Sequence, residues 1–221
     1  MAQITRGCVA ELVKRRFPVR ILTRSPAVCR DIDLYKKATE MTSDGKLVRV
    51  GPSIPCIDDE QVRAIEPGAP VPSARLQSLQ QLSDAGVPVY VSVSPTYPTQ
   101  DWDDFEQLFS RFADLDPEVV FHEPLNPRGA NFGMMMQAAR DGGQDELATE
   151  LEQLTTKERW VEYSLKQMRW VEELGEKFGV DVHIWPDKQV ISSIEAMTGE
   201  QLREKREVSS PEKIPAVPLP T

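Results

Sequence analysis

The sequence of 221 residues is short of cysteine and of long apolar runs, and each shortage excludes a class of protein. No stretch approaches the roughly 18 uninterrupted apolar residues that a membrane-spanning helix needs. The opening segment, MAQITRGCVAELVKRR, is amphipathic and has no apolar core of a secretory signal peptide. The three cysteines are widely spaced and include no CxxC pair, which indicates reduced thiols rather than a disulfide framework. We therefore expect a cytoplasmic protein without a membrane anchor.

Basic residues and histidines are also scarce. Lys and Arg number 26 against 35 Asp and Glu, so the formal net charge is −9. This balance argues against a broad nucleic-acid surface, although it is compatible with a local basic groove. The two histidines, His122 and His183, lack any short ligand spacing, which argues against a zinc site.

Five short segments rich in β-branched or aromatic residues predict strands, at 19–23, 46–50, 87–93, 118–121 and 180–185. Most lack clean alternation, which is typical of strands covered on both faces. Helical patterns lie between them, at 29–37, 73–84, 101–112 and 155–178. This alternation predicts an α/β fold with a parallel sheet, either closed into a barrel or doubly wound.

Four residues predict where helices begin and end. Asp101 is the expected N-cap of the helix at 101–112. Thr155 and Glu158 have the spacing of a capping box at the start of the longest helix. Gly179 is placed to end that helix as a C′ glycine.

Prolines follow each predicted strand within a few residues, and we expect each one to end its strand. In parallel α/β folds the loops at the carboxyl ends of strands carry the active site. The polar residues beside these prolines are therefore the candidate site residues: Arg24, Ser25, Ser53, Ser92, Ser94 and Glu123.

Each candidate also has a structural interpretation. Arg24 suits bidentate binding of a carboxylate, or a surface salt bridge to Asp31 or Asp33. Ser92 and Ser94 share one face of a strand, where they either fill space or bind a ligand. His122 and Glu123 must point to opposite faces, and Glu123 is either a general base or cation anchor, or a structural carboxylate.

Two further features are interpreted as structural. Glu66, in a proline-rich loop, is expected to pair with Arg75 on the following helix. The consecutive methionines 134–136 are candidates for an apolar pocket, but they cannot all share one helical face.

From Glu207 onward, four prolines and no regular pattern predict an extended, solvated tail, with a partner-binding segment as the alternative. The expected organisation is one unit at 1–206 and a tail at 207–221.

Several segments, in order, resemble radical S-adenosylmethionine enzymes of the spore photoproduct lyase-like group. The run ILTRSPAVCRDIDLYKKA at 21–38 resembles that group's "ILTKSPLVLRDIDLL" segment. The stretch at 48–98, with EPGAPVPSAR and AGVPV, is similar to the group's next strand, loop and helix. The opening TRGC, VFHEPLNPRGANF at 120–132 and IWPDKQVI at 184–191 fit the helix before and the strands after.

The resemblance implies a partial (βα)6 barrel, related to TIM barrels, that holds a four-iron–four-sulfur cluster and S-adenosylmethionine. Reductive cleavage of this cofactor in the family gives a 5′-deoxyadenosyl radical, which abstracts hydrogen from a substrate. By position, Arg24 stands where the group has a basic residue beside the cofactor carboxylate. Ser53 and Ser94 stand on strands that line the cavity, and Ser25, Ser92 and Glu123 complete the expected cofactor-binding set.

The sequence departs from the family in one respect: the CxxxCxxC loop whose thiolates hold the cluster is absent. We therefore expect the carboxyl-terminal part of a lyase-like radical enzyme, with its first barrel units missing. It would be a truncated or mis-started product, or half of a split enzyme whose cluster comes from a second polypeptide. An unpaired sheet edge would then favour dimerisation, aggregation or covering by another segment.

Two alternatives belong to other classes of protein. The first is a non-catalytic barrel remnant that acts as a binding or scaffold protein. The second is an ordinary lyase or hydrolase that uses Glu123 with Lys188.

Overall fold

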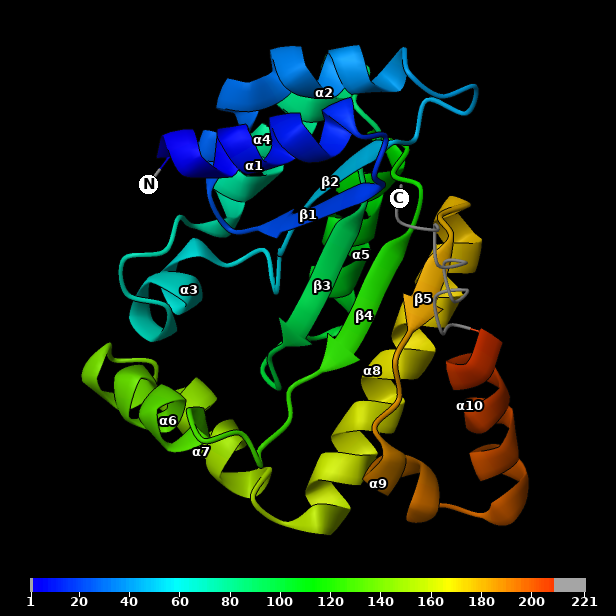
Figure 1. Cartoon of the computed structure of the whole chain (residues 1–221). Helices are drawn as coiled ribbons and strands as arrows, with labels where there is room; N and C mark the ends of the chain where they lie inside the picture. The colour runs from blue at the N-terminus through cyan, green and yellow to red at the C-terminus, as the bar shows by residue number, and fades with distance from the viewer. Residues whose placement is uncertain (1, 209–221) are drawn as a thin grey trace.

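The computed structural model describes residues 2–208, and five parallel strands lie at its centre (Figure 1). The strands are β1 (Val19–Thr23), β2 (Val48–Pro52), β3 (Val91–Thr96), β4 (Val120–Pro124) and β5 (Val182–Ile184). β1 pairs with β2, and β4 pairs with β3 on one side and β5 on the other. Two isolated bridges, Val50 to Val89 and Ser53 to Ser92, join β2 to β3. The strands thus lie in chain order, and within the described residues the sheet does not close into a barrel.

Helices connect these strands and fill the ends of the molecule. They are α1 (Ala2–Lys14), the 3-10 helix η1 (Pro26–Asp31), α2 (Ile32–Thr39), α3 (Asp59–Ile65), α4 (Pro72–Asp84), α5 (Trp102–Ala113), α6 (Phe132–Asp141), α7 (Asp145–Gln153), α8 (Lys157–Phe178), α9 (Lys188–Ser192) and α10 (Ala196–Val208). Within residues 2–208, no helix is both long and apolar enough to cross a membrane.

The five predicted strands are all present, but four of them begin two to four residues later than expected. Pro52 and Pro124 are the last residues of their strands, opposite Thr23 and Thr96, where a missing N–H does not interrupt the ladder. The expectation that proline ends every strand is wrong for β3, because Pro95 lies inside it where the register shifts between Val93 and Thr96.

Two of the predicted helix boundaries are confirmed and one is wrong. Asp101 caps α5 as predicted, in a reciprocal capping box with Asp104, and Gly179 ends α8 with a φ of 65°. The capping box predicted at Thr155 is wrong, because α8 begins at Lys157 after Thr156. The hydroxyls of both threonines donate instead to carbonyls of the preceding helix α7, so neither is available to the first turn of α8.

The expected tail begins inside a helix rather than after one. α10 runs to Val208 and so includes the first two residues of the segment predicted as extended. The rest of that segment, 209–221, lies outside the described residues.

One face of the sheet packs against helices, and none of the helices that the structure describes covers the other. Val48, Val50, Val91, Val93 and Val120 are fully buried on the packed face. In Figure 1, α5 and α8 lie behind β3 and β4, and the near side of these strands is uncovered. The expectation that both faces are covered is therefore wrong for the described residues, and the burial of β1 and β4 alternates along each strand.

The uncovered side, which we call the open face, is lined by the residues that alternate along each strand with those of the packed face; four of them, Gly51, Ser53, Tyr90 and Ser92, are themselves buried. The residues of the open face are Arg20, Leu22, Arg24, Arg49, Gly51, Ser53, Tyr90, Ser92, Ser94, Phe121, Glu123, His183 and Trp185. The guanidinium of Arg20 lies 5.2 Å from the ring centroid of Tyr90 and 5.0 Å from that of Phe121. A cation stacked on two rings thus shields the aromatic side chains of this face, in place of a helix.

Candidate functional site

A cavity of about 290 Å³ lies at the carboxyl ends of the strands, on the side where ligands bind in parallel α/β folds. It lies between the ends of β1, β3 and β4, the loop from α3 to α4, and α6. Its lining residues are Arg24, Ile65, Glu66, Pro67, Ala69, Pro95, Leu125, Asn126, Asn131, Phe132 and Met135. We call it the carboxyl-end cavity.

Arg24 reaches this cavity from the end of β1. Its Nη2 lies 3.6 Å from Oε1 of Glu66, and about half of its side chain is exposed. The alternative of a salt bridge to Asp31 or Asp33 is wrong. Asp31 accepts from Arg6 and Arg30, and Asp33 accepts from Arg6, so both carboxylates already have cationic partners.

Glu66 and Arg75 form a buried pair behind the cavity wall, as predicted. The side chain of Arg75 is fully buried and donates to Oε2 of Glu66 at 2.5 Å, to the Ser53 carbonyl at 2.9 Å and to the Pro70 carbonyl at 2.7 Å. The hydroxyl of Tyr97 donates to Oε1 of Glu66 at 3.1 Å. Burial, together with the neighbouring Glu66 carboxylate, raises the pKa of Tyr97, so its hydroxyl keeps its proton. The wall is therefore held by hydrogen bonds from three different segments of the chain.

The structure brings three of the four predicted serines together. Ser53 and Ser92 face each other across the bridge between β2 and β3, and both are buried. The hydroxyl of Ser53 donates to the Ser94 carbonyl at 3.0 Å. Ser25 has a local structural role, because its hydroxyl caps η1 by accepting from the Ala27 N–H at 3.3 Å.

Glu123 and His122 point to opposite faces, as predicted. Glu123 is exposed on the open face, whereas His122 is buried against α5 and α8. Nε2 of His122 lies 3.2 Å from the Thr96 hydroxyl. Burial lowers the pKa of His122 to about 3, so the ring is neutral near pH 7. This histidine belongs to the core, while Glu123 is exposed on the opposite face.

The cysteines do not form a cluster site. Cys8 is exposed on α1, Cys29 is half-buried in η1, and Cys56 is buried in the loop after β2. Burial raises the pKa of the Cys56 thiol to about 12, which keeps it protonated. In the part of the chain that the structure describes, no group of three His, Cys, Asp or Glu side chains is arranged to hold a metal ion. These residues do not fit an iron–sulfur cluster.

Sequence reasoning missed α6, which forms one wall of the carboxyl-end cavity. Phe132 and Met135 of this helix line the cavity, whereas Met134 between them is 70% exposed. The separation of consecutive methionines onto different faces agrees with helical geometry. The signal that could have identified the helix is the spacing of Phe132, Met135, Met136 and Ala139, which repeats every three to four residues.

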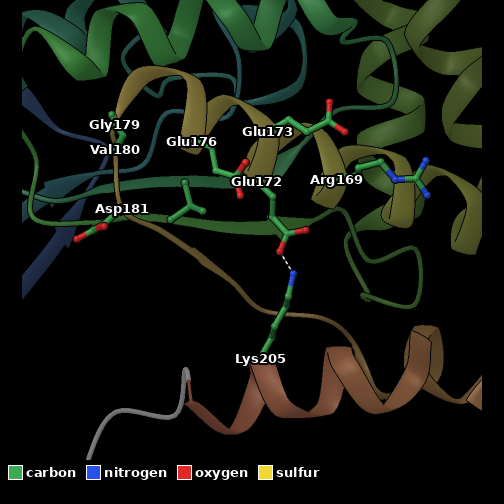
Figure 2. Close-up of a pocket in the computed structure, with 10 residues that line it drawn as sticks. Arg169, Glu172, Glu173, Glu176, Gly179, Val180, Asp181 and Lys205 are labelled. Carbon is green, nitrogen blue, oxygen red and sulfur yellow. Dashed lines mark hydrogen bonds and ion pairs between the residues drawn. The ribbon is translucent and has the colours of Figure 1, made fainter. Parts of the chain in front are cut away.

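A second cavity, of about 650 Å³, lies at the opposite end of the sheet (Figure 2). Acidic residues of α8 and Asp181 line it, and Lys205 of α10 crosses to pair with Glu172. It adjoins the amino end of β5 and the carboxyl end of α8. Because ligands of parallel sheets bind at the carboxyl ends of the strands, we take the carboxyl-end cavity and the open face as the candidate site.

Comparisons with known proteins give relatives without an assigned activity. The chain is 34% identical over 116 residues to an uncharacterized protein of Acidianus two-tailed virus. The matched region covers 50% of this chain and 36% of the viral protein. It is 30% identical over 132 residues to an uncharacterized protein of Mycobacterium tuberculosis, covering 59% of this chain and 38% of the relative. An uncharacterized protein of Methanocaldococcus jannaschii is 31% identical over 96 residues, covering 43% and 34%.

The matched part of the chain spans little more than a third of the length of each of these relatives. No protein-family model matches the chain. No solved structure matches it with significance.

Proposed function

We propose that the chain forms the cofactor-binding wall of a partial (βα) barrel enzyme of the radical S-adenosylmethionine superfamily, of the spore photoproduct lyase-like group. The observation that supports this most is the open face, where strands in chain order carry polar residues at their carboxyl ends. An inward-facing sheet surface of this kind is what a partial barrel presents to its ligand.

The charges on the open face suit S-adenosylmethionine. This cofactor carries one carboxylate together with an ammonium and a sulfonium group. Arg24 is about half exposed at the end of β1, and among the described residues it makes one long ion pair, with Glu66, so it can bind the carboxylate. Glu123 places a negative charge on the same face and favours the cationic part of the cofactor. Ser53, Ser92 and Ser94 are the hydroxyl-bearing residues between them.

The cluster that accompanies this cofactor does not fit the described residues, as the separated cysteines show. We therefore propose no chemical step through a cluster bound by them. Its thiolate ligands would come from a second polypeptide, because Cys8, Cys29 and Cys56 are the three cysteines of this sequence and the structure separates them.

Calorimetric titration with S-adenosylmethionine tests the proposal. We expect wild-type protein to bind, and Arg24→Ala to weaken binding about tenfold, since a half-exposed charged hydrogen bond is worth about 1.4 kcal/mol. The matched control is Arg63→Ala, because the ion pairs of Arg63 in the described part of the chain lie within its own helix α3, with Asp59 and Glu60. Absence of binding by the wild type, or equal loss in both variants, would contradict the proposal.

Iron and sulfide reconstitution tests the statement about the cluster. We expect the chain alone to show no broad visible absorbance after anaerobic reconstitution. A cluster that forms on this chain and is lost on replacing Cys8 and Cys29 with serine would show that the cluster assignment is wrong.

The non-catalytic alternative is favoured by the same separation of the cysteines. A binding or scaffold protein needs no cluster and no S-adenosylmethionine. Failure of the cofactor titration in a folded protein would support this alternative.

A further inference from the structure

The carboxyl-end cavity has walls that the proposed cofactor does not use. Seven of its eleven lining residues are apolar, and they come from the end of α3 and the loop after it, from β3, from the residue after β4 and from α6. The cofactor is assigned to the open face and shares only Arg24 with this cavity. A volume of about 290 Å³ corresponds to roughly ten water volumes and lies at the lower end for small-molecule sites. The cavity therefore has room for a small ligand of largely apolar character.

The charged groups of the cavity leave one cation without a full partner. Arg24 and Glu66 are the charged lining residues. The carboxylate of Glu66 already accepts from buried Arg75 and from Tyr97. Arg24 contacts it at 3.6 Å, an ion pair too long to be a hydrogen bond, and the structure records no hydrogen bond from the Arg24 side chain within the described residues. The guanidinium groups of Arg24 and Arg75 and the carboxylate of Glu66 together carry a net charge of +1 beside the apolar walls.

We propose that this cavity binds a small monocarboxylate with an apolar body. The carboxylate would accept hydrogen bonds from Arg24, and the apolar body would pack against Leu125, Phe132 and Met135. A ligand ammonium would meet the uncompensated Arg24 charge, and a dianion would exceed the single available cation. The ligand class thus follows from one guanidinium that makes a long ion pair but no recorded hydrogen bond, beside apolar walls.

Two neighbouring methionines on α6 make the binding site observable. The side chain of Met135 lines the cavity, and that of Met134 is 70% exposed outside it. In protein carrying carbon-13 methionine methyl groups, titration with 3-phenylpropionate should shift the Met135 methyl resonance by the ring current of the ligand. The Met134 resonance should stay in place. The variants Met134→Leu and Met135→Leu assign the two resonances.

Variants and analogues test the role of charge. We expect Arg24→Gln to weaken 3-phenylpropionate binding about tenfold, and Arg63→Gln to leave it unchanged. The neutral amide 3-phenylpropanamide should bind about tenfold more weakly than the acid, and 2-phenylethylamine more weakly still.

A second pair of variants tests the position of the site. Met135→Glu places a carboxylate inside the cavity and should abolish 3-phenylpropionate binding, whereas Met134→Glu places it outside the cavity and should not. Circular dichroism checks that each variant is folded, and Met135→Trp blocks the cavity without adding charge.

The outcomes separate this inference from the proposed cofactor. Equal binding of acid, amide and amine, or a shift of Met134 rather than Met135, would overturn the inference. Met135→Trp, which adds no charge beside Arg24, should abolish 3-phenylpropionate binding and leave S-adenosylmethionine binding within twofold of the wild type. If the cofactor binds and 3-phenylpropionate does not, the monocarboxylate site is wrong and the proposed function stands. If only 3-phenylpropionate binds, the monocarboxylate site stands and the cofactor proposal fails.

Discussion

Replacing Arg75 with methionine should be among the most destabilising substitutions in the cavity wall. The Arg75 side chain is fully buried and makes three hydrogen bonds, to Glu66, Ser53 and Pro70. Methionine keeps most of the volume but leaves a carboxylate that is 9% exposed without its main partner. Breaking a buried ion pair in this way costs about 3–5 kcal/mol, a large fraction of the stability of a typical domain.

Arg24 provides the matched comparison, because it contacts the same carboxylate. Its side chain is 49% exposed and its contact is 3.6 Å long, so Arg24→Met should cost about 0–1 kcal/mol. Urea unfolding monitored by circular dichroism measures both variants. With a slope of about 2 kcal/mol per molar, a 4 kcal/mol loss moves the midpoint of Arg75→Met by about 2 M.

The double variant Arg75→Met with Glu66→Leu removes both charges. It should recover part of the lost stability, because no uncompensated carboxylate is left behind the wall. An Arg75→Met midpoint within about 0.5 M of the wild type, or equal losses for the two arginines, would refute the argument from burial.

Two further predictions concern the sheet. The pKa of His122 in the folded protein is about 3, below its ordinary value of 6.5. The contribution of the neutral ring to the free energy of unfolding is therefore fully present above pH 6.5 and is lost as the pH falls toward 3. The loss amounts to at most about 1.4 kcal/mol per pH unit. His122→Gln should flatten this dependence more than His183→Gln, since His183 is only half-buried; equal slopes in thermal scans at several pH values would contradict this. A Cβ at Gly51 would lie 2.5 Å from the ring of Tyr90, so Gly51→Ala should destabilise by about 1–3 kcal/mol. Adding Tyr90→Leu should relieve much of that loss in urea unfolding, and an unchanged loss would show that the clash is not its cause.

The elements with strong local signals could be predicted from the sequence. β1 was predicted with its observed ends, because β-branched residues precede the polar turn at Arg24. Asp101 and Gly179 were predicted as helix boundaries because their roles depend on side-chain or backbone chemistry within one turn. The pairing of Glu66 with Arg75 was also predicted, since the loop between them is short and rich in proline.

The features that depend on distant contacts could not be predicted in this way. α6 follows a glycine-containing loop, and its packing against α3 is a contact between segments far apart in the chain. The open face was missed because Leu22, an apolar residue, is 58% exposed, while Tyr90 on the same face is buried. Periodicity therefore did not reveal which face lacks helices. Arg20 covers the rings of Tyr90 and Phe121 from another strand, which no local pattern indicates.

The two faces of the sheet have different physical roles. On the packed face, fully buried valines and the neutral His122 stabilise the fold through apolar burial. At the carboxyl ends, the buried Arg75 fixes Glu66 and thereby the wall beside Arg24, through hydrogen bonds to Glu66 and Pro70 of one loop and to the Ser53 carbonyl after β2. A wall that is already ordered loses little conformational entropy when a ligand binds. Affinity at this site should therefore depend on the ligand's own charge and apolar surface rather than on rearrangement of the protein.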